Sequence, residues 1–122
     1  MFLPINEALK QAKKSKHKHK IGAVIFSKKA IISSACNYPC RSTKKICKKY
    51  IKYMESLHAE VMSIIRARRN LNNFNILVIR INSQYELKMA KPCKYCMAYI
   101  QYVGIKNVYY SDENGNISKI KL

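Results

Sequence analysis

The spacing of apolar side chains divides the first third of the chain into a helix and two strands. Apolar residues recur at helical spacing through the first dozen positions, which predicts a short amphipathic helix. The apolar run 21–26 predicts a buried strand, residues 27–29 a turn, and residues 30–36 a second strand that pairs back as a hairpin. Residues 37–56 are polar and basic, and their pattern fits a loop with a helical turn or two.

The middle of the chain predicts a helix, a strand and a second helix. The pattern becomes helical from Ser56, and the asparagine-rich residues 70–73 end this helix. Residues 74–81 form a long apolar run, which is typical of a central strand. A further helix is predicted from Pro92 to about Val103, because proline suits a helix start and the following glycine suits its end.

Two short strands complete the expected fold. Residues 107–110 predict a fourth strand, and Asn114-Gly115 is a two-residue hairpin signal leading to a fifth strand over 117–120, antiparallel to it. The order α-β-β-α-β-α-β-β predicts an α/β fold with three layers, α/β/α, around a five-stranded mixed sheet. We expect residues 1–122 to form a single domain, because one compact unit commonly has this length.

The charge of the chain adds a constraint on its partners. Lys and Arg total 24 against 6 Asp and Glu, which gives a net charge of +18. Cationic surface attracts polyanions, so the charge favours a phosphate-bearing partner. No apolar run approaches the ~20 residues that span a bilayer, and the N-terminus lacks the layout of a signal peptide. We therefore expect a soluble cytoplasmic protein with no membrane partner.

Two short motifs carry the candidate chemistry. His58-Ala59-Glu60 begins one predicted helix, and Pro92-Cys93-Lys94-Tyr95-Cys96 begins another. Cys93 and Cys96 stand three apart, so both sulfurs point the same way on a first helical turn, where the helix dipole favours the thiolate. With the imidazole of His58 they make three ligands suited to Zn²⁺. The fourth position is left for water, and such open coordination marks a catalytic zinc site.

Glu60 supplies the remaining function that such a site needs. It stands two residues beyond His58, about 200° around a helix, so its carboxylate can reach past the metal toward the water. Zinc lowers the pKa of a bound water to about 7. Glu60 would take the proton of this water and pass it to the ring nitrogen and then to the departing amine of a nucleobase. H-x-E followed by P-C-x-x-C is the signature of zinc deaminases.

On these motifs the sequence resembles the cytidine and deoxycytidylate deaminase superfamily over nearly the whole chain. The resemblance implies a five-stranded sheet covered by helices, with Asn37 in contact with the substrate sugar and Ala59 offering its backbone to the base. Residues 104–110 resemble the segment after the metal helix in deoxycytidylate-type members. The sequence departs from the pattern at Ala35, where such enzymes often have glycine, and this weakens the assignment of Asn37.

Several alternatives stay open. The expected reaction converts cytosine to uracil in a nucleotide or in single-stranded DNA or RNA. The charge favours the polymer, and the C-terminal hairpin favours a free nucleotide and with it a closed homo-oligomer. Adenosine deamination on nucleic acid is an alternative, and so is a non-catalytic zinc module that binds nucleic acid. Three further cysteines could form a second zinc site, although free thiols are the simpler interpretation: Cys36, Cys40 and Cys47.

Overall fold

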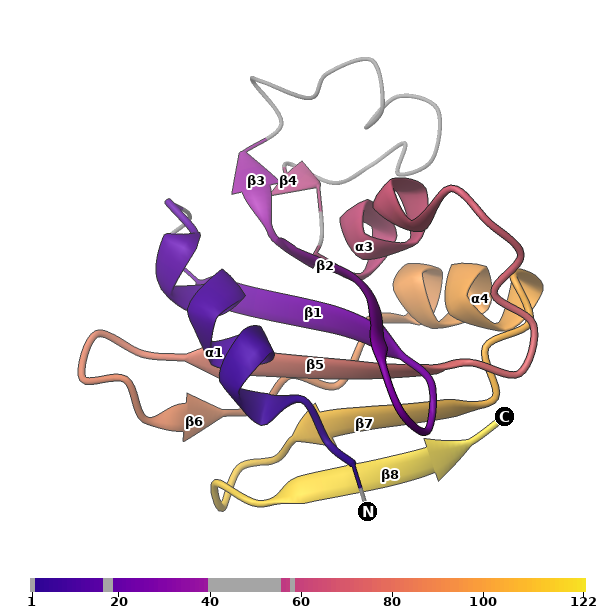
Figure 1. Ribbon diagram of the computed structural model, residues 1–122. Coiled ribbons are helices and arrows are strands. Elements are labelled where there is room, and N and C mark those ends of the chain that lie inside the picture. The colour runs from indigo at the N-terminus through magenta and orange to yellow at the C-terminus, as the bar shows by residue number, and fades with distance from the viewer. Residues whose placement is uncertain (1, 17–18, 40–55, 58) are drawn as a thin grey trace.

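The computed structural model of the chain describes residues 2–16, 19–39, 56–57 and 59–122. These residues form helices on both sides of a mixed sheet, with a small two-stranded ribbon beside it (Figure 1). The helices are α1 (Ile5–Lys14), α3 (Ala59–Ala67) and α4 (Lys94–Tyr102). The strands are β1 (Lys20–Phe26), β2 (Ile31–Cys36), β3 (Tyr38–Pro39), β4 (Ser56–Leu57), β5 (Asn75–Ile81), β6 (Leu87–Lys88), β7 (Asn107–Ser111) and β8 (Ile117–Lys121).

The main sheet has the strand order β2-β1-β5-β7-β8, and β6 adds to it by pairing with one end of β5. Neighbouring strands run antiparallel except β5 and β7, which are parallel because α4 lies in the connection between them. Strand β5 occupies the centre, as its long apolar run predicts. The mixed α/β sheet between helices is therefore confirmed.

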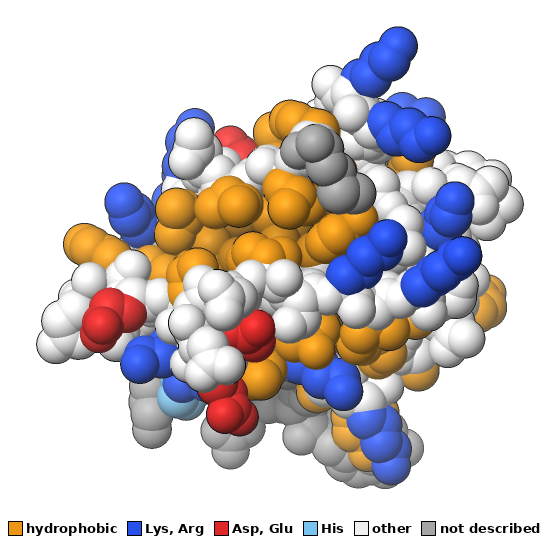
Figure 2. Space-filling model, turned by 90° about the horizontal axis from the view of Figure 1, so that it is seen from below, with side chains coloured by type: hydrophobic (Ala, Val, Ile, Leu, Met, Phe, Trp, Pro, Cys, Tyr) orange, Lys and Arg blue, Asp and Glu red, His pale blue; other side chains and the backbone are white. Residues whose placement is uncertain are grey.

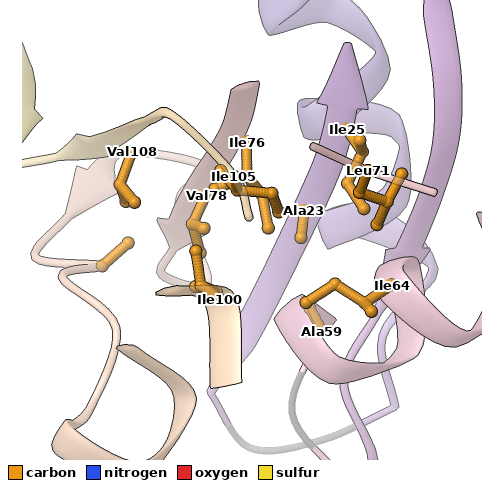
Figure 3. Packing of buried hydrophobic residues seen from close by; sticks show 11 residues of the cluster. Ala23, Ile25, Ala59, Ile64, Leu71, Ile76, Val78, Ile100, Ile105 and Val108 are labelled. Atoms are coloured by element: carbon orange, nitrogen blue, oxygen red, sulfur yellow. The ribbon is translucent and has the colours of Figure 1, made fainter. Parts of the chain in front are cut away.

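Side chains of the central strands alternate between two cores, one on each face of the sheet. On one face α1 covers a cluster that includes Val24, Phe26 and Leu77. On the other face, side chains of α3 and α4 such as Ile64 and Ile100 meet a second cluster (Figure 3). This division explains the three layers, because each face presents enough apolar surface to bind its own helix layer.

Three details differ from the sequence-based prediction. The main sheet has six strands and not five, because the two-residue strand β6 joins it. Ser56 lies in the short strand β4, so the following helix begins only at Ala59. The last hairpin has a five-residue loop, 112–116, in which Gly115 has φ +81° and the Asp112 carboxylate accepts hydrogen bonds from two backbone N–H groups of the loop.

Helix α1 approaches β1 so closely that only glycine fits at position 22. A Cβ atom there would overlap the carbonyl oxygen of Ala8 and lie 2.7 Å from the backbone nitrogen of Ala12. Gly22→Ala is therefore expected to displace α1 and lower the free energy of unfolding by about 3 kcal/mol, the upper end for overpacking. Chemical denaturation measures this change.

Gly115→Ala provides the control, because nothing lies within 4 Å of a Cβ at this position. Its positive φ costs an alanine about 1 kcal/mol. Equal destabilisation by the two substitutions would contradict the close approach of α1 to β1.

In the part of the chain that the structure describes, the helices are too short and too polar to cross a membrane.

Candidate active site

The first of the two candidate segments begins helix α3. Ala59 is its first residue and is fully buried, and Glu60 follows it with only 3 % of its surface exposed. Hydrogen bonds tie this helix to β2: the Ser33 hydroxyl donates to the carbonyl oxygen of Ser63 at 2.7 Å, and the Arg66 guanidinium donates to the carbonyl oxygen of Ser34 at 3.2 Å. A carboxylate of the helix start is thereby held inside the protein.

The second candidate segment begins helix α4. Cys93 is the N-cap residue, and its carbonyl oxygen accepts the first helical hydrogen bond, from the backbone N–H of Met97 at 2.8 Å. Cys96 lies in the first turn and is 1 % exposed. Tyr95, between the two cysteines in the sequence, has 56 % of its surface exposed. Cys96 is therefore buried and Cys93 partly buried, and both pack in one cluster with Val61 of α3.

Ser111 anchors the chain just before this segment. Its hydroxyl donates to the carbonyl oxygen of Lys88 at 2.6 Å and accepts from the backbone N–H of Arg80 at 3.2 Å. Its own carbonyl oxygen accepts from the backbone N–H of Ala90 at 2.9 Å. Ser111 is completely buried, so the path from β6 to Pro92 and Cys93 is fixed against the ends of β5 and β7.

The two helix starts meet in one cluster. Val61 of α3 and Cys96 of α4 are its buried residues, and Cys93 packs against them. The Cys96 thiol makes side-chain hydrogen bonds with Cys93 and Glu60, and the pKa of this thiol is raised. The largest cause is the hydrogen bond with Cys93, followed by burial and then by the negative charge of Glu60. The expectation that the helix start favours the thiolate is therefore not met by these residues alone.

Two neighbouring thiols supply part of a donor set for a divalent cation, and the buried carboxylate beside them can offset some of its charge. A coordinating thiol loses its proton to solvent, and the positive charge then offsets both the thiolate and the nearby carboxylate. Sulfur ligands favour zinc over magnesium or calcium, which prefer oxygen. The described residues of the cluster therefore suit Zn²⁺, and the raised pKa of Cys96 shows what such a cation would relieve.

The remaining predicted ligand, His58, lies outside the described residues, as do Cys40 and Cys47. Within the described ranges, no three His, Cys, Asp or Glu side chains are grouped so as to hold a metal ion. The proposed zinc set therefore depends on His58, which directly precedes Ala59. Cys36 is a buried free thiol at the end of β2, outside the cluster of Cys93 and Cys96.

Asn37 follows β2 and is 2 % exposed. Its Oδ1 atom accepts hydrogen bonds from the Ser15 hydroxyl at 2.6 Å and the Ile21 backbone N–H at 3.1 Å. Its Nδ2 atom donates to the carbonyl oxygen of His19 at 2.6 Å. The amide thus joins the connection between α1 and β1 to the end of β2, and its contact with a substrate sugar stays a prediction.

Sequence reasoning missed two members of this polar network, Ser15 and Arg80. Ser15 is buried and supports Asn37 from the end of α1. The Arg80 guanidinium lies 2.9 Å from Nδ1 of His19, which links β5 to the segment before β1. Arg80 carried a usable signal, because it is the one charged residue inside the apolar run 74–81. Ser15 carried none, since its partner is 22 positions away.

Comparisons with known proteins define first the fold class. A dCMP deaminase from the cyanophage S-TIM5 is 18 % identical, with a TM-score of 0.56 over 92 % of this chain and 86 % of that chain. A structure from a study of A-to-I editing by tRNA:A34 deaminases is 20 % identical, with a TM-score of 0.60 over 89 % of this chain and 74 % of that one. The architecture is therefore that of the cytidine deaminase-like fold.

The family follows from the sequence match. The family model described as the cytidine and deoxycytidylate deaminase zinc-binding region matches residues 4–112, and the chain belongs to this family. The zinc-binding character of the family confirms the expected Zn²⁺ cofactor. An uncharacterized deaminase in the luxG 3' region of Aliivibrio fischeri is 32 % identical over 96 residues, which are 76 % of this chain. The chain spans 58 % of the length of that relative.

Proposed function

We propose that this chain is a single-domain zinc-dependent deaminase that hydrolyses cytosine to uracil in a phosphate-bearing substrate. The observation that carries the proposal is the burial of the Glu60 carboxylate against the Cys96 thiol at the meeting of two helix starts. A structural zinc site closed by four protein ligands has no use for a buried acid beside its cysteines. Family membership supports the same reaction class.

In this mechanism His58, Cys93 and Cys96 hold the zinc, which when bound acidifies a water molecule and so supplies a nucleophile at neutral pH. Glu60 takes a proton from that water and delivers it to the ring nitrogen beside the reacting carbon. It would then transfer the remaining proton of the attacking oxygen to the amino group. A carbon–oxygen bond forms, the carbon–nitrogen bond breaks, and ammonia leaves. The buried backbone of Ala59 lies next to this acid and is proposed to orient the base.

The substrate is proposed to carry phosphate, as a nucleotide or within a single strand. The net charge of +18 supports this, because it concentrates polyanions near the surface. The S-TIM5 enzyme, whose structure includes a complex with dCMP and dUMP, supports the nucleotide. The tRNA:A34 deaminase supports a nucleic acid, with adenosine as the alternative base.

A substrate screen tests the proposal. The zinc-loaded protein is incubated with cytidine, deoxycytidine, their monophosphates, and single-stranded DNA and RNA that contain cytosine, while uracil and ammonia are measured. We expect both products from at least one phosphate-bearing compound, and we expect the nucleosides to react more slowly. A strand that contains adenosine and no cytosine is included, and inosine is measured as its product. Inosine from this strand, with no uracil from any other compound, would replace cytosine by adenosine in the proposal.

Metal coordination separates the enzyme from the non-catalytic zinc module. X-ray absorption of the zinc-loaded protein should report one nitrogen, two sulfurs and one oxygen from water. A fourth protein ligand, together with absence of turnover in the screen, would contradict the enzymatic proposal. Light scattering of the same sample tests the expected homo-oligomer.

A further inference from the structure

A basic hollow of about 460 Å³ lies at the end of the sheet where β5 and β7 begin. Among the described residues its lining includes no acidic side chain and four exposed lysines from three parts of the chain: Lys28 and Lys29 in the turn between β1 and β2, Lys106 before β7, and Lys119 in β8. Figure 2 shows a group of Lys and Arg side chains on the right, where no Asp or Glu side chain is visible, whereas on the left Lys and Arg lie among Asp and Glu.

This hollow is separate from the candidate active site. Asn75 and Asn107, which line it, begin β5 and β7 and share the side of the sheet that Leu77 and Tyr109 present to α1. Glu60 lies on the opposite face, where α3 packs. A ligand in the hollow therefore does not occupy the cluster of Cys93, Cys96 and Glu60.

The lining of the hollow suits a ligand that brings hydrogen-bond donors as well as negative charge. The Asn107 amide nitrogen donates to Oδ1 of Asn75 at 2.8 Å, whereas Oδ1 of Asn107 is buried and has no hydrogen-bond partner among the described residues. A buried acceptor without a donor is destabilising. Base N–H groups, such as N3–H of thymine and uracil, and the 2′-hydroxyl of ribose supply such donors beside a phosphate, and inorganic phosphate at neutral pH supplies few.

The hollow also extends beyond the size that one phosphate would need. A second hollow of about 290 Å³ adjoins it, because Lys28 and Asn75 line both. Phe2 lines the second hollow and is 38 % exposed, with its ring edge-on to Phe26 at 5.9 Å. A basic hollow beside an exposed aromatic ring is an arrangement that proteins use to bind single-stranded nucleic acids. The phosphate backbone follows the positive charges, and bases stack on the ring.

We propose that this basic hollow binds the phosphate backbone of a single-stranded nucleic acid, at a site separate from the candidate active site. The inference does not depend on the deaminase reaction. In this proposal the excess positive charge at this end of the molecule serves to bind a polymer, whose phosphates contact several lysines at once. Each lysine that neutralises a phosphate releases bound counterions, so binding must weaken as salt rises.

The test measures binding of labelled oligothymidylate and oligouridylate by fluorescence anisotropy over a range of salt concentrations. These strands contain no cytosine or adenine, so the candidate active site has no target base in them. The hollow variant carries Lys28→Gln, Lys29→Gln, Lys106→Gln and Lys119→Gln. Each single-strand phosphate contact contributes about 0.7 to the slope of log K against log salt. We therefore expect the slope of this variant to fall by up to about 3.

The matched control carries Lys10→Gln, Lys14→Gln, Lys16→Gln and Lys88→Gln, which remove the same charge from exposed lysines outside the hollow. We expect its slope to change by less than 1, and we expect the circular dichroism of both variants to match that of the parent. An equal loss of slope in the two variants, or no loss in the hollow variant, would overturn the proposal.

Competition separates a polymer from a small anion. Unlabelled oligothymidylate is expected to displace the probe at a phosphate concentration at least 100-fold lower than thymidine monophosphate or inorganic phosphate requires. Displacement by the monophosphate at the same phosphate concentration would overturn the proposal that the ligand is a polymer and would indicate a nucleotide site. Turnover of a mononucleotide by the hollow variant is expected to equal that of the parent, which distinguishes failure here from failure of the proposed function.

Discussion

Glu60→Gln is expected to reduce kcat for the cytosine substrate by about 10²- to 10⁴-fold while the bound zinc stays at the parent level. Glutamine has nearly the same shape as glutamate and keeps the packing of a side chain that is 3 % exposed, but its amide cannot accept and release the water proton. The proposed ligands His58, Cys93 and Cys96 are untouched by this change. Ammonia release gives kcat and KM, and atomic emission gives the zinc content.

Glu113→Gln is the matched control, because it removes the same charge from an exposed loop between β7 and β8. Its kcat should equal that of the parent. A Glu60→Gln variant with undiminished kcat would contradict the proton transfer assigned to this residue. If the variant loses both its bound zinc and its turnover, Glu60 would instead be assigned to metal binding.

The elements that the sequence predicts are those with a long apolar pattern. Helix α1 has apolar residues at helical spacing, and strand β5 is a nearly continuous apolar run, so the positions of both follow from the pattern alone. Strand β6 has two residues and no period to detect. Its pairing with β5 depends on the side chain of Asn82, whose oxygen accepts hydrogen bonds from the backbone N–H groups of Gln84 and Glu86 at 3.0 and 2.9 Å.

The candidate site was predictable to the extent that its chemistry lies in short motifs. The spacing of Cys93 and Cys96 places both on one side of a helix start, and the structure has them there. The raised pKa of the Cys96 thiol was not predictable, because two of its causes are tertiary: burial, and the charge of Glu60 from another helix. The helix dipole is a weaker effect than these contacts.

The basic hollow was even less predictable from the sequence, because it also depends on contacts between distant parts of the chain. Its four lysines span positions 28 to 119, and only Lys28 and Lys29 are neighbours in the sequence. They meet only because β1, β5, β7 and β8 follow one another in the sheet and the relevant turns and strand starts fall at one end. Net charge predicted a polyanionic partner, but the strand order decides where the charge gathers.

Cys96→Ser is expected to abolish the stabilisation that zinc gives to the parent protein. At a free zinc concentration 1,000 times the dissociation constant, binding raises the free energy of unfolding by about 4 kcal/mol, and a hydroxyl is a poor substitute for the sulfur ligand. Because the pKa of the Cys96 thiol is raised, the metal must displace a proton to bind, so zinc affinity should increase with pH. Thermal unfolding with and without chelator measures the first effect, and calorimetric titration in buffers of different ionisation enthalpy measures the second.

Cys36→Ala is the control for this prediction, because Cys36 is also buried but lies at the end of β2, outside the cluster of Cys93 and Cys96. It should keep the full zinc-dependent shift in unfolding and the full proton release. A Cys96→Ser variant that responds to zinc like the parent would remove Cys96 from the proposed ligands. Loss of the response in Cys36→Ala alone would move the metal toward β2, and the proposed role of Glu60 beside it would then lose its physical basis.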